Sequence, residues 1–481
     1  MSHHNTGQFS KIFKMKNHDI PFLDGDKTAK PNHQRCFWRK VLETLQIIFL
    51  IVTVFIIFAS FQNVFQSQKP EIQFKRSAPV SCRLKIVESV PEGMVFNKTY
   101  GSIYSTWKSL IEEAEESIDI ASFYWTLRGS DVVNDSSAWQ GEDIFQSILE
   151  AGLNRSIKIR IVESKPSRIS PDEDTIEISR RKAAQVRVLD FDRLVGGGVL
   201  HTKMWIVDRN HIFLGSANMD WRSLTQVKEV GVWIQDCPHL AKDAEKMFKI
   251  YWKMGEDGAV VPEHWPVSLG TDINAESPLP VTYGNNGSVS NIYFSSSPPQ
   301  FVTLGRTGDI DAILRAIRTA KKFISISVME YLPIIMFDHP KKYWPIIDDA
   351  LKSAAIDRRI AVKILVGHWK HSPPEMEFFL KSFLNLNLVY PHVDIQVKRF
   401  IVPTLTPSQA AIPFARVNHD KFMVTDNVAY IGTSNWSGDY FINTAGIGIV
   451  VEDDVPHENE LRIQLRDLFD RDWNSSYSFS L

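Results

Sequence analysis

One sequence pattern occurs in both halves of this 481-residue chain and limits the folds that it can adopt. The pattern is H-x-K-x4-D followed by G-[S/T]-x-N, and it runs from His201 to Asn218 and again from His419 to Asn435. The preceding segments also correspond, because in both halves helix-like segments alternate with short apolar, strand-like ones. The matched segments are 110–125 with 314–331, 157–164 with 361–368, and 185–192 with 394–401. The sequence therefore predicts an α/β fold of two duplicated α-β-α sandwich halves, which form a pseudo-dimer with a site between them.

The residue types in the repeated pattern indicate an anion-binding site. Side chains two positions apart on a strand point to the same face, so each copy should present an imidazole beside an ammonium group. Gly215 and Gly432 allow the next loop to approach closely, and the asparagines that follow supply amide donors. A phosphodiester fits such a site, since lysines and amides can hold its non-bridging oxygens and stabilise the transition state. The predicted substrate-binding residues are Lys203, Asn218, Lys421 and Asn435.

Two histidines allow a covalent reaction in two steps. One neutral imidazole, of His201 or His419, would attack phosphorus to form a phosphohistidine, and the other, protonated, would donate to the leaving oxygen. Water would then complete the hydrolysis. A lysine two positions from each histidine would repel a divalent cation, so we expect no metal ion and no other cofactor. This reasoning leaves open which histidine is the nucleophile.

Three acidic residues are expected to support these groups. Asp208 and Asp426 end the two H-x-K-x4-D copies where the chain turns, so their side chains should lock the turn rather than carry protons. Glu229 follows the first copy, and no acid stands at the matching place in the second half. A carboxylate bonded to one imidazole would raise its pKa and give the two histidines different roles. The alternative for Glu229 is a surface ion pair with Lys228 or Arg222.

Residues 41–61 form an apolar segment of the length that spans a bilayer, which is about 20 residues. Residues 1–40 contain eight Lys or Arg against three acids, and the positive-inside rule places that side in the cytosol. The expected arrangement is a type II signal anchor, with the rest of the chain in a lumen or outside the cell. Because the whole chain has 54 basic and 56 acidic residues, the luminal part is acidic. Any affinity for nucleic acid must then come from a local groove.

The cysteines and glycosylation sequons agree with this orientation. Cys82 and Cys237 are the only luminal pair, so we expect them to form a disulfide in an oxidising compartment. Asn435 is both a motif residue and a sequon, and it should be unglycosylated if it lines the site. The other expected glycosylation sites are Asn97, Asn134, Asn154, Asn286 and Asn474.

Shifts in composition predict the order of the domains. One segment without periodicity follows the apolar one, and another rich in Pro, Gly, Ser and Asn separates the two halves. The predicted order is a cytosolic tail at 1–40, a transmembrane signal-anchor helix at 41–61, a luminal stalk at 62–80, a first half at 81–262, a linker at 263–299 and a second half at 300–481.

With these motifs, the chain from about residue 82 to 478 resembles the phospholipase D superfamily, whose signature is the same pair of patterns. The type II anchor and several segments resemble the endolysosomal branch of that superfamily, phospholipase D members three and four. These segments are SFYWTL at 122–127, GSANMDWRSLTQVKE at 215–229, MEYLP at 329–333, DIQVK at 394–398 and GTSNWSG at 432–438. The chain departs from the pattern of these relatives in two ways. The gap between Asp426 and Gly432 is one residue shorter than the corresponding gap in the first copy, and the luminal part has too few cysteines for an additional C-terminal disulfide.

The resemblance implies the phospholipase D-type fold and a 5′-3′ exonuclease that degrades single-stranded DNA and RNA. It also implies transport from the endoplasmic reticulum and Golgi to endosomes and lysosomes, and allows proteolytic release of a soluble form. The catalytic residues that it implies are His201, Lys203, Asn218, Glu229, His419, Lys421 and Asn435, with Asp208 and Asp426 as supports.

The resemblance leaves a second activity open, a lipid phosphodiesterase or transphosphatidylase that acts on phosphatidylglycerol-type lipids. The expected partners are single-stranded nucleic acid, the membrane through the anchor and, for the second activity, a phospholipid; a homodimer is compatible with the sequence. Five aromatic residues near the motif strands are candidates for base stacking, with a place in the core as the alternative. They are Tyr124, Trp125, Trp221, Tyr331 and Trp436.

Overall fold

The computed structural model describes residues 41–42, 44–46, 48–50, 52–53 and 55, and then 78–167, 172–284, 287–453 and 459–481. The chain divides into a unit at 1–74 and a second unit at 75–481. Among the described residues, no helix has the length and apolar character required to cross a bilayer. The expected tail at 1–40 lies outside the described residues, as do much of the expected anchor at 41–61 and most of the stalk at 62–80.

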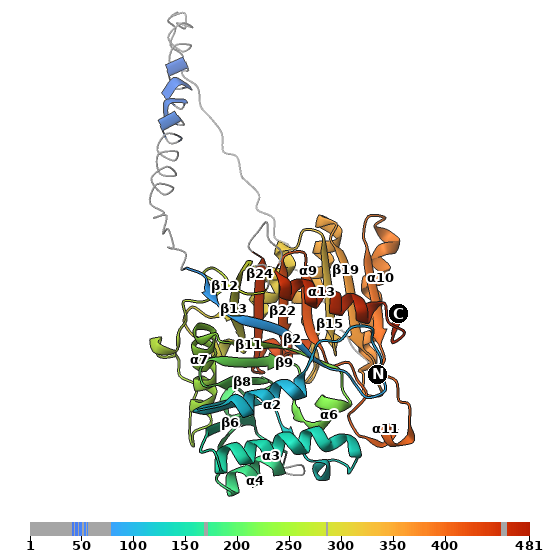
Figure 1. Cartoon of the computed structure of the whole chain (residues 1–481). Coiled ribbons are helices and arrows are strands. Elements are labelled where there is room, and N and C mark those ends of the chain that lie inside the picture. Colours follow the sequence, from blue (N-terminus) through green and yellow to red (C-terminus); the bar gives the residue numbers. More distant parts are fainter. Residues whose placement is uncertain are drawn as a thin grey trace, which may run out of the picture. The chain divides into compact units, whose positions relative to one another are not determined.

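The second unit contains two large mixed sheets whose central strands follow the same order (Figure 1). The first sheet has the order β3 (Gly101–Ser102), β2 (Arg83–Ser89), β11 (Glu229–Gln235), β9 (His211–Gly215), β8 (Met204–Val207), β4 (Ser117–Ser122), β6 (Lys158–Ser164) and β7 (Gln185–Leu189). In this sheet β4, β6 and β7 are parallel, and β8 is antiparallel to β4.

The second sheet repeats this plan and adds strands at both edges. Its order is β1 (Val80–Ser81), β12 (Leu279–Thr282), β13 (Val289–Ser297), β24 (Gly446–Asp453), β22 (Val428–Gly432), β21 (Lys421–Thr425), β15 (Phe323–Val328), β19 (Ala361–Gly367), β20 (Ile395–Phe400) and β25 (Ser478–Ser480), with β14 (Thr307–Gly308) beside β13. Here β15, β19 and β20 are parallel and β21 is antiparallel to β15, as in the first half. The predicted duplicated α/β fold is therefore present in the described residues.

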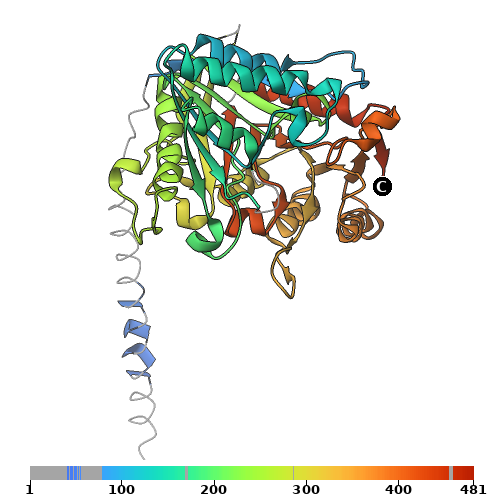
Figure 2. The ribbon, with the colours of Figure 1, turned by 90° about the horizontal axis from the view of Figure 1, so that it is seen from below.

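Helices cover both faces of each sheet. The outer face of the first sheet packs against α2 (Ile103–Glu113) and α3 (Trp139–Leu153), which lie side by side in Figure 2. The outer face of the second packs against α8 (Asp309–Thr319), α9 (Ile346–Arg358) and α10 (Pro374–Val389). Between the sheets, α7 (Pro238–Met254) and α13 (Glu460–Trp473) join one continuous apolar core to which both halves contribute. The halves thus bury their inner faces against each other, which fixes where residues of one half meet the other.

The expected linker at 263–299 contributes to the second half instead of standing apart from it. Strands β12 and β13 both lie within this segment, and β13 pairs with β24 from Ser290 to Ser297. Strand β1 pairs with β12, so the chain enters the second unit at the edge of the second sheet before it builds the first. The disulfide between Cys82 and Cys237 is present, as predicted, and joins the start of β2 to the residue before α7.

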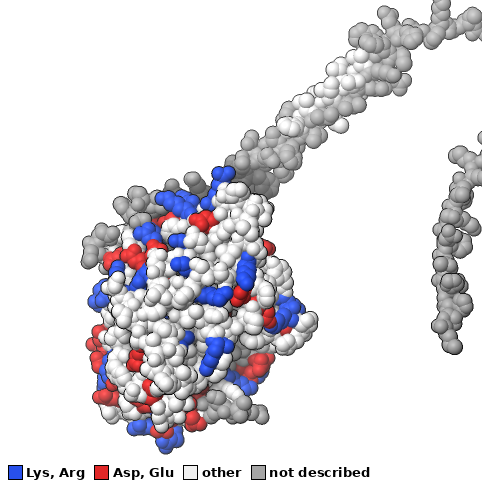
Figure 3. All heavy atoms as spheres, turned by 90° about the vertical axis from the view of Figure 1, so that its right-hand side faces the viewer, with Lys and Arg blue, Asp and Glu red and all other residues white. Residues whose placement is uncertain are grey.

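The charged residues on the face shown in Figure 3 are mixed in sign, with Lys and Arg interspersed among Asp and Glu. This face therefore offers no broad cationic surface, which matches the slight acidic excess of the sequence. Expected sequons at Asn97, Asn134, Asn154 and Asn474 are exposed, whereas Asn435 is buried. Asn286 lies outside the described residues.

Candidate active site

The two motif histidines lie just before strands β8 and β21, at the junction of the two halves. The backbone N–H of His201 donates to the carbonyl of Ala445 at 2.8 Å, and that of His419 donates to the carbonyl of Lys228 at 2.8 Å. Parallel bridges pair Leu200 with Ala445 and Lys228 with Asn418, so each half holds the histidine of the other. Two equivalent contacts related by the duplication thus bring the imidazoles together.

Hydrogen bonds to the backbone place both motif lysines. Strand β8 begins at Met204, so His201 and Lys203 precede it, whereas Lys421 is the first residue of β21. In both copies the lysine is bonded to its own histidine: Lys203 Nζ donates to the carbonyl oxygen of His201 at 2.7 Å, and Lys421 Nζ donates to that of His419 at 2.7 Å. Each ammonium group is thereby fixed next to its own histidine and keeps donors for an anion.

The two imidazoles differ in their Nδ1 partners. His419 Nδ1 lies 2.8 Å from Glu229 Oε2, and Glu229 is the first residue of β11 in the other half. His201 Nδ1 instead donates to the carbonyl oxygen of Thr433 at 2.8 Å. Gly446 occupies the position that matches Glu229, and a Cβ there would lie 2.1 Å from the Ser434 hydroxyl oxygen. The matching place in the second half therefore has no carboxylate, and the Nδ1 contacts leave Nε2 of each ring for a substrate.

A cavity of about 390 Å³ is lined by both imidazoles and by the motif asparagines. Asn218 Nδ2 donates to the hydroxyl of Tyr124 at 3.3 Å, and Asn435 Nδ2 donates to that of Tyr440 at 3.0 Å. Glu229 and Glu330 line the same cavity. Two imidazoles, two amides and the Glu229 carboxylate of the predicted site therefore face a common space, whereas Lys203 and Lys421 are not among its lining residues.

Burial and like charges shift the pKa values of the basic groups downward. Burial lowers the pKa of His201 well below its usual value, and the charges of Lys203 and Lys421 lower it further. Burial also lowers the pKa of His419, but the Glu229 carboxylate opposes that shift. The pKa of Lys421 falls to about 8, chiefly through burial. His201 is thus the ring held neutral, and His419 is the one whose protonated form has a counter-charge.

The two aspartates that end the motifs act on the backbone away from the cavity. Asp208 accepts hydrogen bonds from the backbone N–H groups of three consecutive residues, 115–117, between α2 and β4. Asp426 accepts from the N–H groups of residues 321 and 322, between α8 and β15. Each aspartate therefore ties the hairpin that carries the motif to the neighbouring helix–strand connection, in line with the turn role expected for it.

Several cavity residues were not singled out from the sequence. Glu330 follows β15 at the place where Tyr124 follows β4, and Tyr440 lies in α12 (Asp439–Ile442). Arg222, in α6 (Trp221–Thr225), pairs with Asp220 at 2.7 Å. The signal that marks Glu330 is its position in the repeat, because matched positions after equivalent strands reach the same site. Of the five aromatic stacking candidates, only Tyr124 lines the cavity; Trp125, Trp221, Tyr331 and Trp436 are buried in the core.

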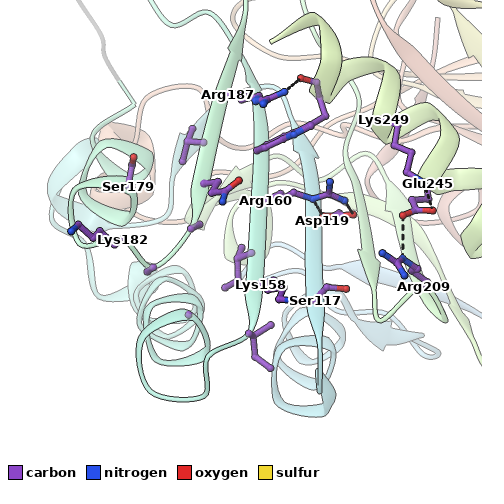
Figure 4. A pocket seen from close by; sticks show the side chains of 18 residues that line it. Ser117, Asp119, Lys158, Arg160, Ser179, Lys182, Arg187, Arg209, Glu245 and Lys249 are labelled. Atoms are coloured by element: carbon purple, nitrogen blue, oxygen red, sulfur yellow. Dashed lines mark hydrogen bonds and ion pairs between the residues drawn. The ribbon is translucent and has the colours of Figure 1, made fainter. Parts of the chain in front are cut away.

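A larger cavity of about 890 Å³ lies beside strands β4, β6 and β7 (Figure 4). It is rich in Lys and Arg, but several of these are already paired. Arg160 forms an ion pair with Asp119 at 2.6 Å, and Arg209 pairs with Glu245 at 3.1 Å. No histidine lines it among the described residues. Size alone therefore does not identify the candidate site, and the smaller cavity is the one that both motif histidines line.

Comparison with known proteins gives consistent matches. Residues 96–405 match the family model described as "PLD3/4, PLD-like domain". The chain is 44% identical to the 5'-3' exonuclease PLD3 of Xenopus laevis over 456 residues, covering 92% of this chain and 91% of that protein. It is 45% identical to the human 5'-3' exonuclease PLD3, covering 85% and 83%, and 43% identical to the mouse 5'-3' exonuclease PLD4, covering 83% and 80%.

Among solved structures, the chain resembles the phosphatidylserine synthase of Haemophilus influenzae. The TM-score is 0.54 at 12% sequence identity, and the match covers 83% of this chain and 87% of that one. At this identity the likeness concerns the fold alone. It extends over both halves of the second unit.

Proposed function

Because the chain belongs to the PLD3/4 family of phospholipase D-like proteins, we propose that it is a 5′-3′ exonuclease that hydrolyses single-stranded DNA and RNA through a phosphohistidine and without a metal ion. The observation that carries the proposal is the pair of imidazoles, one from each half, that face one cavity with different Nδ1 partners. The relatives that match most of the chain bear the name of this activity.

The unequal environments of the histidines support a division of roles. His201, whose pKa is lowered well below its usual value, more readily stays neutral than His419, so its Nε2 lone pair attacks phosphorus while the bond to the leaving oxygen breaks. His419, with Glu229 behind it, carries the proton that the leaving oxygen receives. Water then attacks the phosphohistidine, gives its proton to His419 and frees His201. The Glu229 carboxylate stabilises the imidazolium whenever it forms.

The remaining motif residues would hold the reacting phosphate. Lys203 and Lys421 supply positive charge, while Asn218 and Asn435 supply amide donors, so four side chains surround the non-bridging oxygens. Because these donors are already oriented by His201, His419, Tyr124 and Tyr440, little reorganisation is needed as charge develops. Affinity for a polyanion is then local to this cavity.

The chain's location follows from separate observations. The Cys82–Cys237 disulfide indicates an oxidising compartment, as in the secretory pathway. We infer a type II anchor at 41–61 from the sequence, with the two halves in the lumen of the endoplasmic reticulum and Golgi and then of endosomes and lysosomes. Cleavage in the segment at 62–80 would release a soluble form. An acidic lumen suits a reaction that needs one protonated imidazole of lowered pKa.

The test is cleavage of a labelled 5′-hydroxyl oligonucleotide by the purified full chain in detergent. We expect shortening from the 5′ end, fastest at acidic pH and unchanged by a chelator, and a loss of about 10²–10⁴-fold for His201→Ala and for His419→Ala. Abolition by the chelator, or full activity of both variants, would contradict the mechanism. The same preparation is also incubated with phosphatidylglycerol. A lipid phosphodiesterase would hydrolyse this lipid and leave the oligonucleotide intact, whereas a nuclease would cleave the oligonucleotide.

A further inference from the structure

Three aromatic rings lie together at the mouth of the catalytic cavity. Phe414 and Trp369 both line the cavity, and Phe414 is 61% exposed. The ring of His371 stacks on that of Phe414, with centroids 4.8 Å apart and planes 20° from parallel. The ring centroid of Trp369 lies 4.7 Å from that of His371 and 6.3 Å from that of Phe414. We call these three residues the aromatic platform.

Phe414 is held in place although its side chain is exposed. Its neighbours Ile412 and Ala415 are buried, and they pack with Trp221 of the first half. Arg222, which also lines the cavity, donates from Nη1 to the carbonyl oxygen of Pro413 at 2.6 Å. The exposed ring thus sits between two anchored residues, so it cannot withdraw into the core without breaking contacts between the halves.

The backbone of Phe414 is strained in a way that this anchoring sustains. Its φ angle is +53°, a left-handed conformation that bulky residues rarely adopt. Such conformations persist only where the surrounding structure enforces them, and they are concentrated at binding and catalytic sites. An exposed apolar ring and a strained backbone both oppose stability. Their coincidence next to a catalytic cavity points to a ligand that uses the ring.

The chemistry of the surroundings favours a nucleobase as that ligand. A base of a single strand has a free π-face that stacks on an aromatic ring, and nearby cations hold the strand's phosphates. Lys370 is exposed between Trp369 and His371, whereas the charge of Arg222 is already paired with Asp220. A fatty acyl chain would call for a long apolar groove in place of one flat stack with a lysine beside it.

Resting on the proposed nuclease function, we propose that the aromatic platform stacks a nucleobase of the single-stranded substrate and so presents the adjoining phosphodiester to the two histidines. The platform would select strands that carry bases near the cleaved end over equally charged strands without them. It would raise affinity without taking part in bond breaking, because the rings contact the base and not the phosphorus.

The experiment compares two oligonucleotides of equal length, one with bases throughout and one abasic at its terminal positions. Binding is measured by fluorescence anisotropy on the full chain in detergent carrying His201→Ala, with and without Phe414→Ala. We expect the chain that carries His201→Ala alone, here called the parent, to bind the base-bearing strand more tightly than the abasic one by roughly 5- to 150-fold. This is the usual range for stacking of one base. Phe414→Ala should bring that ratio close to one, and Phe414→Tyr should keep it.

A matched control is Phe378→Ala, because Phe378 is also highly exposed but lies on α10 and not among the cavity residues. Its ratio should equal that of the parent. An unchanged affinity ratio in Phe414→Ala would overturn the proposal. An equal loss of affinity for both oligonucleotides would also overturn it, and so would a variant that loses only the turnover of phosphatidylglycerol vesicles. Cleavage by the wild-type chain is scored separately, so a chain that cuts no oligonucleotide contradicts the nuclease proposal while the binding ratio still decides on the platform.

Discussion

At the scale of single residues, the roles of the two histidines are set by what stands behind each ring. His419 faces the Glu229 carboxylate, whereas His201 faces a backbone carbonyl, and Gly446, which has no side chain, stands at the matching place. A carboxylate stabilises an imidazolium far more than a neutral carbonyl does. In the proposed mechanism, the same residue type therefore serves as acid in one half and as nucleophile in the other.

Glu229→Gln tests this division of labour. The amide keeps the shape but removes the charge that raises the pKa of His419, so that pKa should fall further below its usual value. The rate requires protonated His419 and is lost as the pH rises through its pKa. The alkaline limb of the kcat profile should then move to lower pH, with a loss of about 10²–10⁴-fold near neutrality. An unshifted limb in the kcat profile from pH 4 to 8 would contradict the assignment.

Glu330 gives a second, separable pH effect. Burial raises the pKa of Glu330, while the charge of Lys421 lowers it in part. Above that pKa the ionised carboxylate opposes a phosphate at Lys421, and below it the neutral acid does not. Glu330→Gln should therefore lower KM at neutral pH by several-fold, with little change at acidic pH and no shift in the kcat profile. Steady-state kinetics at neutral and at acidic pH measure this change. A Glu330→Gln variant whose KM equals that of the wild type at both pH values would contradict the prediction.

The motif residues could be found from the sequence, and the residues around them could not. His201, Lys203, Asn218 and their counterparts belong to one repeated pattern, so their types and spacing predict a shared site. Phe414 belongs to no such pattern, and only the fold shows that it borders the cavity. Glu330 occupies a position that the repeat matches with Tyr124, but the two residue types differ, so the repeat predicts its place and not its chemistry. Trp125 and Trp436 were reasonable stacking candidates by position, but side chains of strand residues next to the motifs enter the core.

At the scale of elements, the matched segments predict the parallel strands and their helices. The composition of residues 263–299 predicts a linker, but strands β12 and β13 lie in this segment. The sequence of β13 is rich in serine, which is typical of loops. In the fold two of these hydroxyls have buried partners: Ser295 donates to Asp309 at 2.7 Å, and Ser297 donates to the Thr444 carbonyl at 3.0 Å. Polar composition therefore concealed a central strand, because partners distant in sequence satisfy its side chains.

The disulfide is an element-scale constraint with a measurable effect. It connects β2 to the start of α7 across 155 residues, so it restricts the unfolded chain strongly. Replacing both cysteines by serine should lower the free energy of unfolding by about 2–5 kcal/mol. The activity at low temperature should persist, since neither cysteine borders the cavity. Chemical denaturation under non-reducing conditions measures the change, and equal stability of the two proteins would contradict it.

At the scale of the whole molecule, a fully buried ion triad joins the halves behind the active site. Lys228 Nζ lies 2.5 Å from Asp420 Oδ2 and 2.8 Å from Asp472 Oδ2, and all three side chains are buried. Lys228 precedes Glu229, Asp420 follows His419, and Asp472 belongs to α13. The triad therefore helps to set the register in which Glu229 meets His419.

Lys228→Met should cost about 3–5 kcal/mol of unfolding free energy, because it leaves the Asp420 carboxylate buried without its cation, whereas Asp472 keeps its ion pair with Arg471. The double variant with Lys228→Met and Asp420→Asn should recover much of that loss. The control is Lys98→Met, which breaks the exposed pair with Asp467 and should change stability by less than about 1 kcal/mol. Urea unfolding curves decide the matter: a Lys228 variant as stable as the Lys98 variant would show that the triad does not hold the halves.

The paired bridges from Leu200 to Ala445 and from Lys228 to Asn418 have a consequence for how such a site can diverge. In a homodimer of single halves, every substitution appears twice, so a carboxylate behind one histidine would also stand behind the other. With both halves encoded in one chain, Glu229 can arise opposite a retained Gly446. Covalent fusion thus lets each histidine specialise while the backbone contacts that bring them together stay equivalent.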